Sequence, residues 1–232
     1  MSTNLLPKTA EVDYPTGDGK PMAETDFHRI LMNRLIDTLQ WRYRDVPDVN
    51  VSGNLLMFYV EGDKRRHVSP DVYVAKGVSN EPRFNYLLWR EGRPPNLVIE
   101  ITSKSTRQED QEEKLVLYQN ELKVREYFLF DPLNQYLKPQ LKGYRLQAGA
   151  YQPIEAVRGR LPSEEIGVHF EADGKQLRMF DPETDAYLVT GQEYEAQQAK
   201  EQRQRAEAAE QRVAELMAML AKSQSQQPPT GQ

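Results

Sequence analysis

Two acidic residues stand in short apolar segments that read as strands. Asp71 opens the segment 71–75 (DVYVA), and Glu100 interrupts the apolar run 96–101 (NLVIEI). An unpaired carboxylate in a buried strand is costly, so Glu100 should face a metal ion, a cation or water. Two carboxylates that converge from neighbouring strands are the ligands that a hard divalent metal ion requires. A structural alternative stays open, in which Asp71 caps a turn after Pro70 and Glu100 pairs with a lysine or arginine.

Several short motifs occur in a fixed order between residues 14 and 138. They are 18–24 (DGKPMAE) with His28 one turn later, 51–54 (VSGN), 68–72 (VSPDV), 100–107 (EITSKSTR), Asp110 with Lys114, and 124–132 (VREYFLFDP). Each motif alone is weak. Together, over about half of the chain, they closely resemble the Uma-type restriction endonucleases, a bacterial family within the PD-(D/E)XK nuclease superfamily.

This resemblance implies a restriction-endonuclease-like α/β fold and a nuclease site. Asp71 and Glu100 would bind Mg²⁺ or Mn²⁺, with Glu24 on the first helix as a further acidic member. In the superfamily the ion activates water for in-line attack on a DNA phosphodiester bond and stabilises charge on the phosphate oxygens. We therefore expect hydrolysis of DNA. His28 is expected to pack within the helix or to support Glu24.

The superfamily signature places a lysine two residues after the glutamate, and this sequence has Thr102 there. Two other lysines are candidates for the catalytic role: Lys104, directly after the strand, and Lys114, on the following helix. The family pattern carries a lysine at the helical position, so Lys114 is favoured. Asp110, Lys114 and Tyr118 are spaced to share one helical face. An ordinary salt bridge between Asp110 and Lys114 is the alternative, and both roles can coexist. Thr102 can still offer its backbone carbonyl to a metal ion.

The elements that must position these residues follow from hydrophobic periodicity and turn signals. We expect helices at 22–41 and 108–121, strands at 54–60, 71–75, 96–101 and 125–130, and a loop at 79–95. The first helix should bury an apolar face made of Phe27, Ile30, Leu31, Leu35 and Leu39. This order predicts an α/β fold with a mixed sheet flanked by helices.

The hydrophobic and turn pattern changes after residue 141. Short strands and turns between 141 and 190 predict β-hairpins that extend the sheet, and residues 192–222 predict a helix. Ala199, Ala206, Val213 and Leu220 recur every seven positions, with Ala209 and Leu216 between them. Because Glu195 and Gln202 interrupt this seam, it predicts a weak coiled coil and a homo-oligomer, in the simplest case a dimer.

These patterns divide the chain into four parts. They are a flexible arm at 1–19, the nuclease-like domain at 20–190, the helical tail at 191–222 and a disordered end at 223–232. The lean apolar content of 38% agrees with parts that lie outside a core.

Composition narrows the function further. The absence of cysteine excludes a disulfide framework, a zinc finger and a thiol nucleophile. No apolar run spans a membrane and the N-terminus lacks a signal pattern, so a cytoplasmic location is expected. The net charge of −5 argues against a nucleic-acid coat protein but allows an enzyme with local basic patches. Residues 64–67 (KRRH) are either such a patch or a solvated turn.

A second function class remains compatible with the sequence. The chain could be a non-catalytic nucleic-acid-binding or scaffold protein that keeps the nuclease fold and interacts through its coiled-coil tail. Binding of a divalent metal would separate the two, because a scaffold need not bind one.

Overall fold

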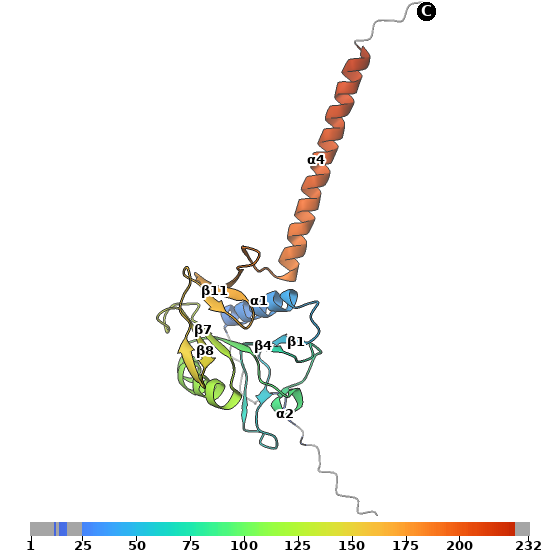
Figure 1. Ribbon diagram of the computed structural model, residues 1–232. Helices are drawn as coiled ribbons and strands as arrows, with labels where there is room; N and C mark the ends of the chain where they lie inside the picture. Colours follow the sequence, from blue (N-terminus) through green and yellow to red (C-terminus); the bar gives the residue numbers. More distant parts are fainter. Residues whose placement is uncertain (1–11, 13, 18–24, 226–232) are drawn as a thin grey trace, which may run out of the picture. The chain divides into compact units, whose positions relative to one another are not determined.

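The computed structural model describes residues 12, 14–17 and 25–225, with side chains to residue 219 (Figure 1). The chain forms two units, residues Met1–Leu188 and Val189–Gln232. None of the helices in the described ranges is long and apolar enough to cross a membrane.

A six-stranded mixed sheet forms the centre of the first unit. Its strand order is β1-β4-β6-β7-β8-β9. Strands β6 and β7 pair in parallel, and every other neighbouring pair in this sheet is antiparallel. The strands are β1 (Val49–Ser52), β4 (Val72–Lys76), β6 (Leu97–Ile101), β7 (Glu126–Phe130), β8 (Leu141–Gln147) and β9 (Ala150–Pro153). Each residue of β6 and β7 is buried, as expected for central strands covered on both faces. The predicted α/β class with a mixed sheet is confirmed.

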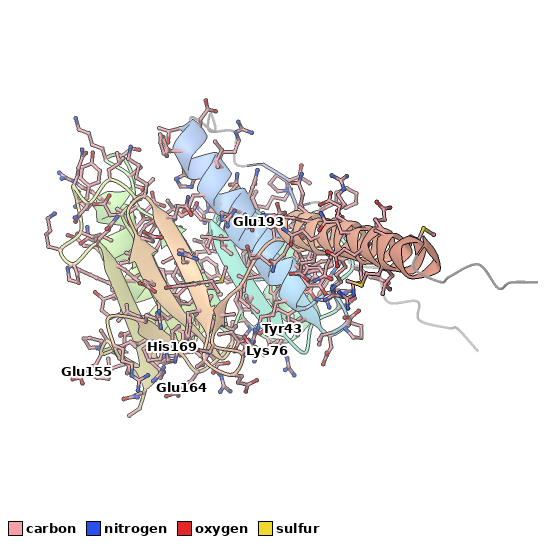
Figure 2. All side chains as sticks on the ribbon, turned by 90° about the horizontal axis from the view of Figure 1, so that it is seen from above. Tyr43, Lys76, Glu155, Glu164, His169 and Glu193 are labelled. Carbon is pink, nitrogen blue, oxygen red and sulfur yellow. The ribbon has the colours of Figure 1, made fainter. Side chains whose placement is uncertain are left out.

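Two layers cover the two faces of this sheet. On one face lie helix α1 (Asp26–Arg42) and a four-stranded antiparallel sheet. That sheet consists of β10 (Leu161–Ser163), β11 (Val168–Asp173), β12 (Gln176–Asp181) and β13 (Ala186–Tyr187). Figure 2, seen from above, shows α1 and these strands side by side. The hairpins predicted at 141–190 therefore split between the central sheet and this second sheet.

The opposite face is covered by a helical segment and a small sheet. The helical segment runs from η1 (Glu109–Glu113, π-helical) through α3 (Lys114–Leu117) to η2 (Tyr118–Leu122, π-helical). The small sheet has the order β3-β2-β5, with β2 (Met57–Phe58), β3 (His67–Val68) and β5 (Tyr86–Leu87), and β5 leads into helix α2 (Leu88–Glu91). The helix predicted at 108–121 thus exists, with π turns at both ends.

The strand predicted at 54–60 is mostly wrong. Only Met57 and Phe58 pair as a strand, and Asn54 has a left-handed backbone with φ of 51°. The apolar run reflects the burial of Leu56, Met57 and Phe58. It does not indicate how long the strand is. The strand β1, which lies just before this run, had no sequence prediction.

The buried face of α1 differs in part from the prediction. The helix begins after Thr25, whose Oγ1 accepts the His28 N–H at 3.2 Å as an N-cap. Leu31, Leu35 and Leu39 are buried as predicted, but Phe27 and Ile30 are 54% and 62% exposed. His28 is buried, and its inward turn rotates Phe27 and Ile30 toward solvent.

The second unit contains helix α4 (Gly191–Ser225). Thr190 and Glu193 form a capping box, because each side chain accepts the backbone N–H of the other residue. The helix predicted at 192–222 is confirmed and continues to Ser225, so residues 223–225 are helical instead of disordered; 226–232 lie outside the described residues.

At the other terminus, one residue of the predicted flexible arm is packed. The Tyr14 ring lies 4.9 Å from that of Phe58 and 5.2 Å from that of Trp89, and its hydroxyl accepts the Gly62 N–H.

Candidate active site

Asp71 and Glu100 lie opposite each other at one end of the central sheet. Strands β4 and β6 pair with Val72 opposite Ile99, so one further step in this register places Asp71 opposite Glu100. The Asp71 carboxylate accepts the Ile101 N–H through Oδ2 at 2.7 Å. The two carboxylates singled out in the sequence are therefore brought together across neighbouring strands.

A close backbone approach holds Asp71 in place. The Asn54 N–H donates to the Pro70 carbonyl at 2.8 Å, which draws the backbone of residues 53–54 against the start of β4. A Cβ atom added to Gly53 would lie 1.9 Å from the Asp71 carbonyl oxygen. Only glycine fits at position 53, which gives the 51–54 motif a physical reason.

His28 contacts Asp71 from the other side. Its Nε2 lies 3.1 Å from Asp71 Oδ1, and both side chains are largely buried. The expectation for His28 was packing in the helix or support for Glu24. The observed contact is with Asp71, and Glu24 lies outside the described residues.

Glu100 is fully buried and has a partner for each oxygen. Lys114 Nζ donates to Oε2 at 2.9 Å, and the Tyr118 hydroxyl donates to Oε1 at 2.8 Å. Ile99 and Ile101 face the core beneath α1, so the alternation along β6 turns Glu100 toward the helical segment. The predicted shared face of Asp110, Lys114 and Tyr118 meets Glu100 there.

Lys114 joins two carboxylates. Its Nζ lies 3.1 Å from Asp110 Oδ1, in addition to its bond with Glu100. The Asp110–Lys114 salt bridge weighed from the sequence is therefore present. It coexists with the contact to Glu100, so it does not replace a role for Lys114 in the site.

The burial of these groups shifts their pKa values. Burial raises the pKa of Glu100 well above its usual value, with further upward contributions from Asp71 and Asp110, while Lys114 pulls it down. Burial likewise raises the pKa of Asp110, against the attraction of Lys114. For Lys114, burial acts to lower the pKa, but the attraction of Glu100 and Asp110 outweighs it and raises the pKa. Lys114 is therefore an ammonium at neutral pH, able to donate hydrogen bonds but not to accept a proton.

Two tyrosines join the helical segment to the central sheet. The Tyr127 hydroxyl donates to the Asp110 backbone carbonyl at 2.8 Å, and its ring lies 5.0 Å from that of Tyr118. Tyr118 carries the second hydrogen bond to Glu100. The available signal was the position of Tyr118 four residues after Lys114 on one helical face.

The other lysine candidate lies apart from this network. Lys104 is exposed in the turn after β6 and makes no hydrogen bond or ion pair with any residue that the structure describes. Thr102 is buried, its N–H donates to the Phe130 carbonyl at 2.8 Å, and its Oγ1 has no hydrogen-bond partner within residues 25–225.

A cleft opens beside Lys114. It has a volume of about 350 Å³ and lies between the β2–β3 region, which contributes Tyr59, His67 and Ser69, and the helical segment, which contributes Glu109 and Glu113. The cleft gives solvent a path to the buried lysine.

The basic residues 64–67 sit on the β2–β3 turn and are partly neutralised. Arg65 pairs with Asp63 at 3.1 Å, and Arg66 pairs with Glu121 at 3.3 Å while its guanidinium lies 5.0 Å from the Tyr59 ring. These contacts favour the turn interpretation of the patch.

The donor set fits a hard divalent cation in its chemistry. Asp71, Glu100 and Asp110 offer carboxylate oxygens, and these acidic groups outnumber the one lysine among them. Across residues 12, 14–17 and 25–225, however, no three His, Cys, Asp or Glu side chains form a group arranged to hold an ion. Of the three ligands expected from the sequence, the structure describes Asp71 and Glu100, and Glu24 lies outside the described residues.

One family model matches most of the chain. The sequence model of the Uma2 family, described as "Putative restriction endonuclease", matches residues 4–179. No curated protein matches the chain. A crystal structure of a "putative nuclease belonging to DUF820" from Anabaena variabilis ATCC 29413 is similar, with a TM-score of 0.48 and 15% sequence identity. The similarity covers 66% of this chain and 81% of that one.

Proposed function

The chain belongs to the Uma2 family of putative restriction endonucleases, and we propose that it is a metal-dependent endonuclease that hydrolyses phosphodiester bonds of DNA. The observation that carries this proposal is the arrangement of Asp71 opposite Glu100 with Lys114 bound to Glu100. A structural ion pair needs only Glu100 and Lys114, whereas a nuclease site also needs a second strand-end carboxylate.

We propose that Asp71 and Glu100 bind Mg²⁺ or Mn²⁺, with Glu24 as a further ligand. The bound ion would supply activation of water and stabilisation of charge on the phosphate oxygens. Metal binding requires ionised carboxylates, and the ammonium of Lys114 favours the ionised form of Glu100.

The residues of the chain contribute binding and positioning. The Ile101 N–H and His28 fix the orientation of the Asp71 carboxylate from two sides. Lys114, held by two carboxylates on a packed helical segment, can donate to a phosphate oxygen or to the attacking water. Because Lys114 stays protonated, its contribution is orientation and charge stabilisation, and removal of the water proton falls to another group.

A cleavage assay on supercoiled plasmid tests this function. Wild-type protein with Mg²⁺ or Mn²⁺ is expected to nick the plasmid, and EDTA is expected to stop the reaction. Asp71→Ala and Glu100→Gln are expected to abolish nicking, while Glu155→Gln, at an exposed position just after β9, serves as the matched control. Equal cleavage by wild type and both site variants would assign the activity to a contaminant or to another site.

Calorimetry with Mn²⁺ alone separates an inactive enzyme from a scaffold. We expect binding by the wild type and a loss of binding in Asp71→Ala. A wild type that neither cleaves nor binds Mn²⁺ would favour the scaffold function.

We also propose that the protein self-associates through α4. Among the side chains described for this helix, Val213, Leu216, Met217 and Met219 are about half exposed or more. An isolated helix gains little stability in water, so an apolar seam of this kind favours a partner helix. The heptad spacing makes a second copy of the same helix the partner with matching periodicity.

A further inference from the structure

A second pocket lies at the end of the central sheet opposite the acidic site. It has a volume of about 420 Å³ and is lined by residues 92–96 together with Lys123 and Arg125. Asn96 directly precedes β6, and Arg125 directly precedes β7, whereas Glu100 lies near the far end of β6. Glu100 follows Asn96 by four positions along the strand, which corresponds to about 13 Å.

The lining of this pocket is basic. Arg93, Lys123 and Arg125 contribute three cations, and no residue of the lining carries a carboxylate. Glu165 is the nearby acidic group, and its Oε2 accepts a hydrogen bond from Asn96 at 2.8 Å while its Oε1 lies 3.5 Å from Arg125. This carboxylate pairs with Arg125, and the charged residues of the lining itself are all cations, within a chain whose net charge is −5.

The position of Arg93 is fixed by its surroundings. Its Nη1 donates to the Lys76 carbonyl at 3.3 Å, and the guanidinium lies directly against Gly77. A Cβ atom at Gly77 would come within 2.4 Å of Arg93 Nη1, and the φ of Gly77 is +74°. Glycine at this position thus makes room for the guanidinium, and an arginine held in this way loses less entropy when it binds an anion.

Lys123 occupies a conformation that favours glycine. It ends the helical segment with a φ of 56°, its N–H donates to the Tyr118 carbonyl, and its side chain is exposed. Glycine is the usual residue at such a left-handed helix end, because other residues are strained there. The helix end itself adds partial negative charge, so the positive potential of the pocket comes from the side chains.

An anionic ligand follows from these features. An arginine held against Gly77 and two exposed cations suit a phosphate group, whose oxygens accept paired N–H bonds from guanidinium groups. The pocket lies about 13 Å from the acidic site along β6, and Lys123 follows Lys114 by nine positions of the helical segment, which gives about the same length. One DNA strand advances about 3.4 Å per nucleotide along the duplex axis, so this separation equals about four nucleotides.

We propose that this pocket binds a backbone phosphate of the nucleic-acid substrate, about four nucleotides from the bond that is cut. The assignment rests on the proposed nuclease function. It predicts that the DNA contact surface extends along the helical segment from Lys114 to Lys123.

DNA binding without metal tests the proposal independently of cleavage. The variant Lys123→Gly combined with Arg125→Gln removes two cations, and glycine at position 123 relieves the backbone strain, so the variant should remain folded. Arg158→Gly is the matched control, because Arg158 is an exposed cation with a φ of 52° in a different turn. Affinity for a short fluorescein-labelled duplex is measured by anisotropy in EDTA over a range of salt concentrations.

The double variant is expected to bind the duplex at least about tenfold more weakly. The slope of the logarithm of its binding constant against the logarithm of the salt concentration should be smaller in magnitude by about one. The control is expected to bind like the wild type. Unchanged affinity and salt dependence in the double variant would overturn the proposal, as would the absence of duplex binding by the wild type. Pyrophosphate binding that is lost in the double variant while duplex affinity stays unchanged would reassign the pocket to a small phosphate ligand.

Hydrolysis of bis(p-nitrophenyl) phosphate with Mn²⁺ keeps the two proposals apart. This substrate is too short to reach the second pocket, so the double variant is expected to hydrolyse it at the wild-type rate. If the wild type hydrolyses neither this ester nor DNA, the nuclease proposal fails, and the duplex-binding result still decides whether the pocket contacts nucleic acid.

Discussion

Lys114 Nζ lies 2.9 Å from Glu100 Oε2 in the interior of the protein, where Glu100 has no solvent exposure. A buried ion pair of this kind is a weak source of stability, because desolvation offsets the attraction. Loss of one partner, in contrast, leaves an uncompensated buried charge. The pair therefore couples the proposed chemistry to the integrity of the fold, and experiments on Lys114 must measure both.

The first prediction concerns which lysine acts. Lys114→Ala is expected to lower DNA cleavage at saturating DNA by about 100-fold or more, the typical loss for an electrostatic or acid–base group. It should also lower the free energy of unfolding by about 3 to 5 kcal/mol, because Glu100 loses its partner. Cleavage rates and thermal unfolding together test this.

Lys104→Ala is the comparison for this prediction. Lys104 is exposed, so its loss should leave stability and turnover at saturating DNA unchanged and weaken DNA binding by about one phosphate contact. A Lys104→Ala protein without turnover, beside a Lys114→Ala protein that cuts normally, would reverse the assignment.

The second prediction concerns Gly53. Gly53→Ala would place a Cβ atom 1.9 Å from the Asp71 carbonyl oxygen, so the backbone that carries Asp71 must shift. We expect a loss of about 1 to 3 kcal/mol in the free energy of unfolding, and weaker Mn²⁺ binding by calorimetry. Gly17→Ala is the control, because a Cβ atom there meets nothing within 4 Å. Wild-type stability and metal affinity in Gly53→Ala would show that the backbone at position 53 yields without moving Asp71.

The pairing of Asp71 with Glu100 was within reach of the sequence, since turn signals and strand length place both residues near strand ends. The contact between Lys114 and Glu100 could be predicted from the sequence only in part. Spacing puts Asp110, Lys114 and Tyr118 on one helical face, but it does not say which strand residue that face meets. The π turns at 109–113 and 118–122 have no sequence signature that periodicity detects.

The errors have a common physical cause, which is that hydrophobicity reports burial without reporting its geometry. The run 54–60 is apolar because Leu56, Met57 and Phe58 are buried, yet only two of its residues pair as a strand. On α1, hydrophobicity predicts that Phe27 is buried. The structure instead buries His28 beside Asp71 and leaves Phe27 exposed. Hydrophobic periodicity therefore gives the wrong buried face where a polar residue such as His28 faces the site.

The third prediction concerns the attachment of α1, which carries His28, to the second sheet. Arg42, at the end of α1, pairs with Asp181 of β12 at 2.9 Å. Burial acts to raise the pKa of Asp181, but hydrogen bonds from Arg42 and from the Glu183 N–H outweigh it and lower the pKa. A lowered pKa means that the pair stabilises the fold above the unfolded-state pKa of about 4 and that this contribution disappears as the pH falls through the folded-state pKa.

Asp181→Asn is expected to lower the free energy of unfolding by about 1 kcal/mol at neutral pH, because the partly buried pair loses its charge. The difference from the wild type should shrink as the pH falls below about 4. Thermal unfolding of both proteins across this range measures it, with Asp173→Asn as an exposed carboxylate control. A difference that stays constant at acid pH would mean that Asp181 acts through its shape and its hydrogen bonds to the backbone.

The last prediction concerns assembly through α4. The heptad spacing places Val213 and Leu216 on the predicted seam, whereas Met219 lies beside it although it is similarly exposed. Truncation after Gly191 should leave the first unit folded and reduce the oligomer to a monomer in light scattering, because that unit has its own core. Val213→Gln combined with Leu216→Gln should weaken the oligomer by about tenfold or more, since both residues would be buried in a dimer. Met219→Gln should have little effect, which separates a specific seam from general hydrophobic association. If the full-length and truncated proteins have the same number of subunits per particle, α4 is excluded as the main contact.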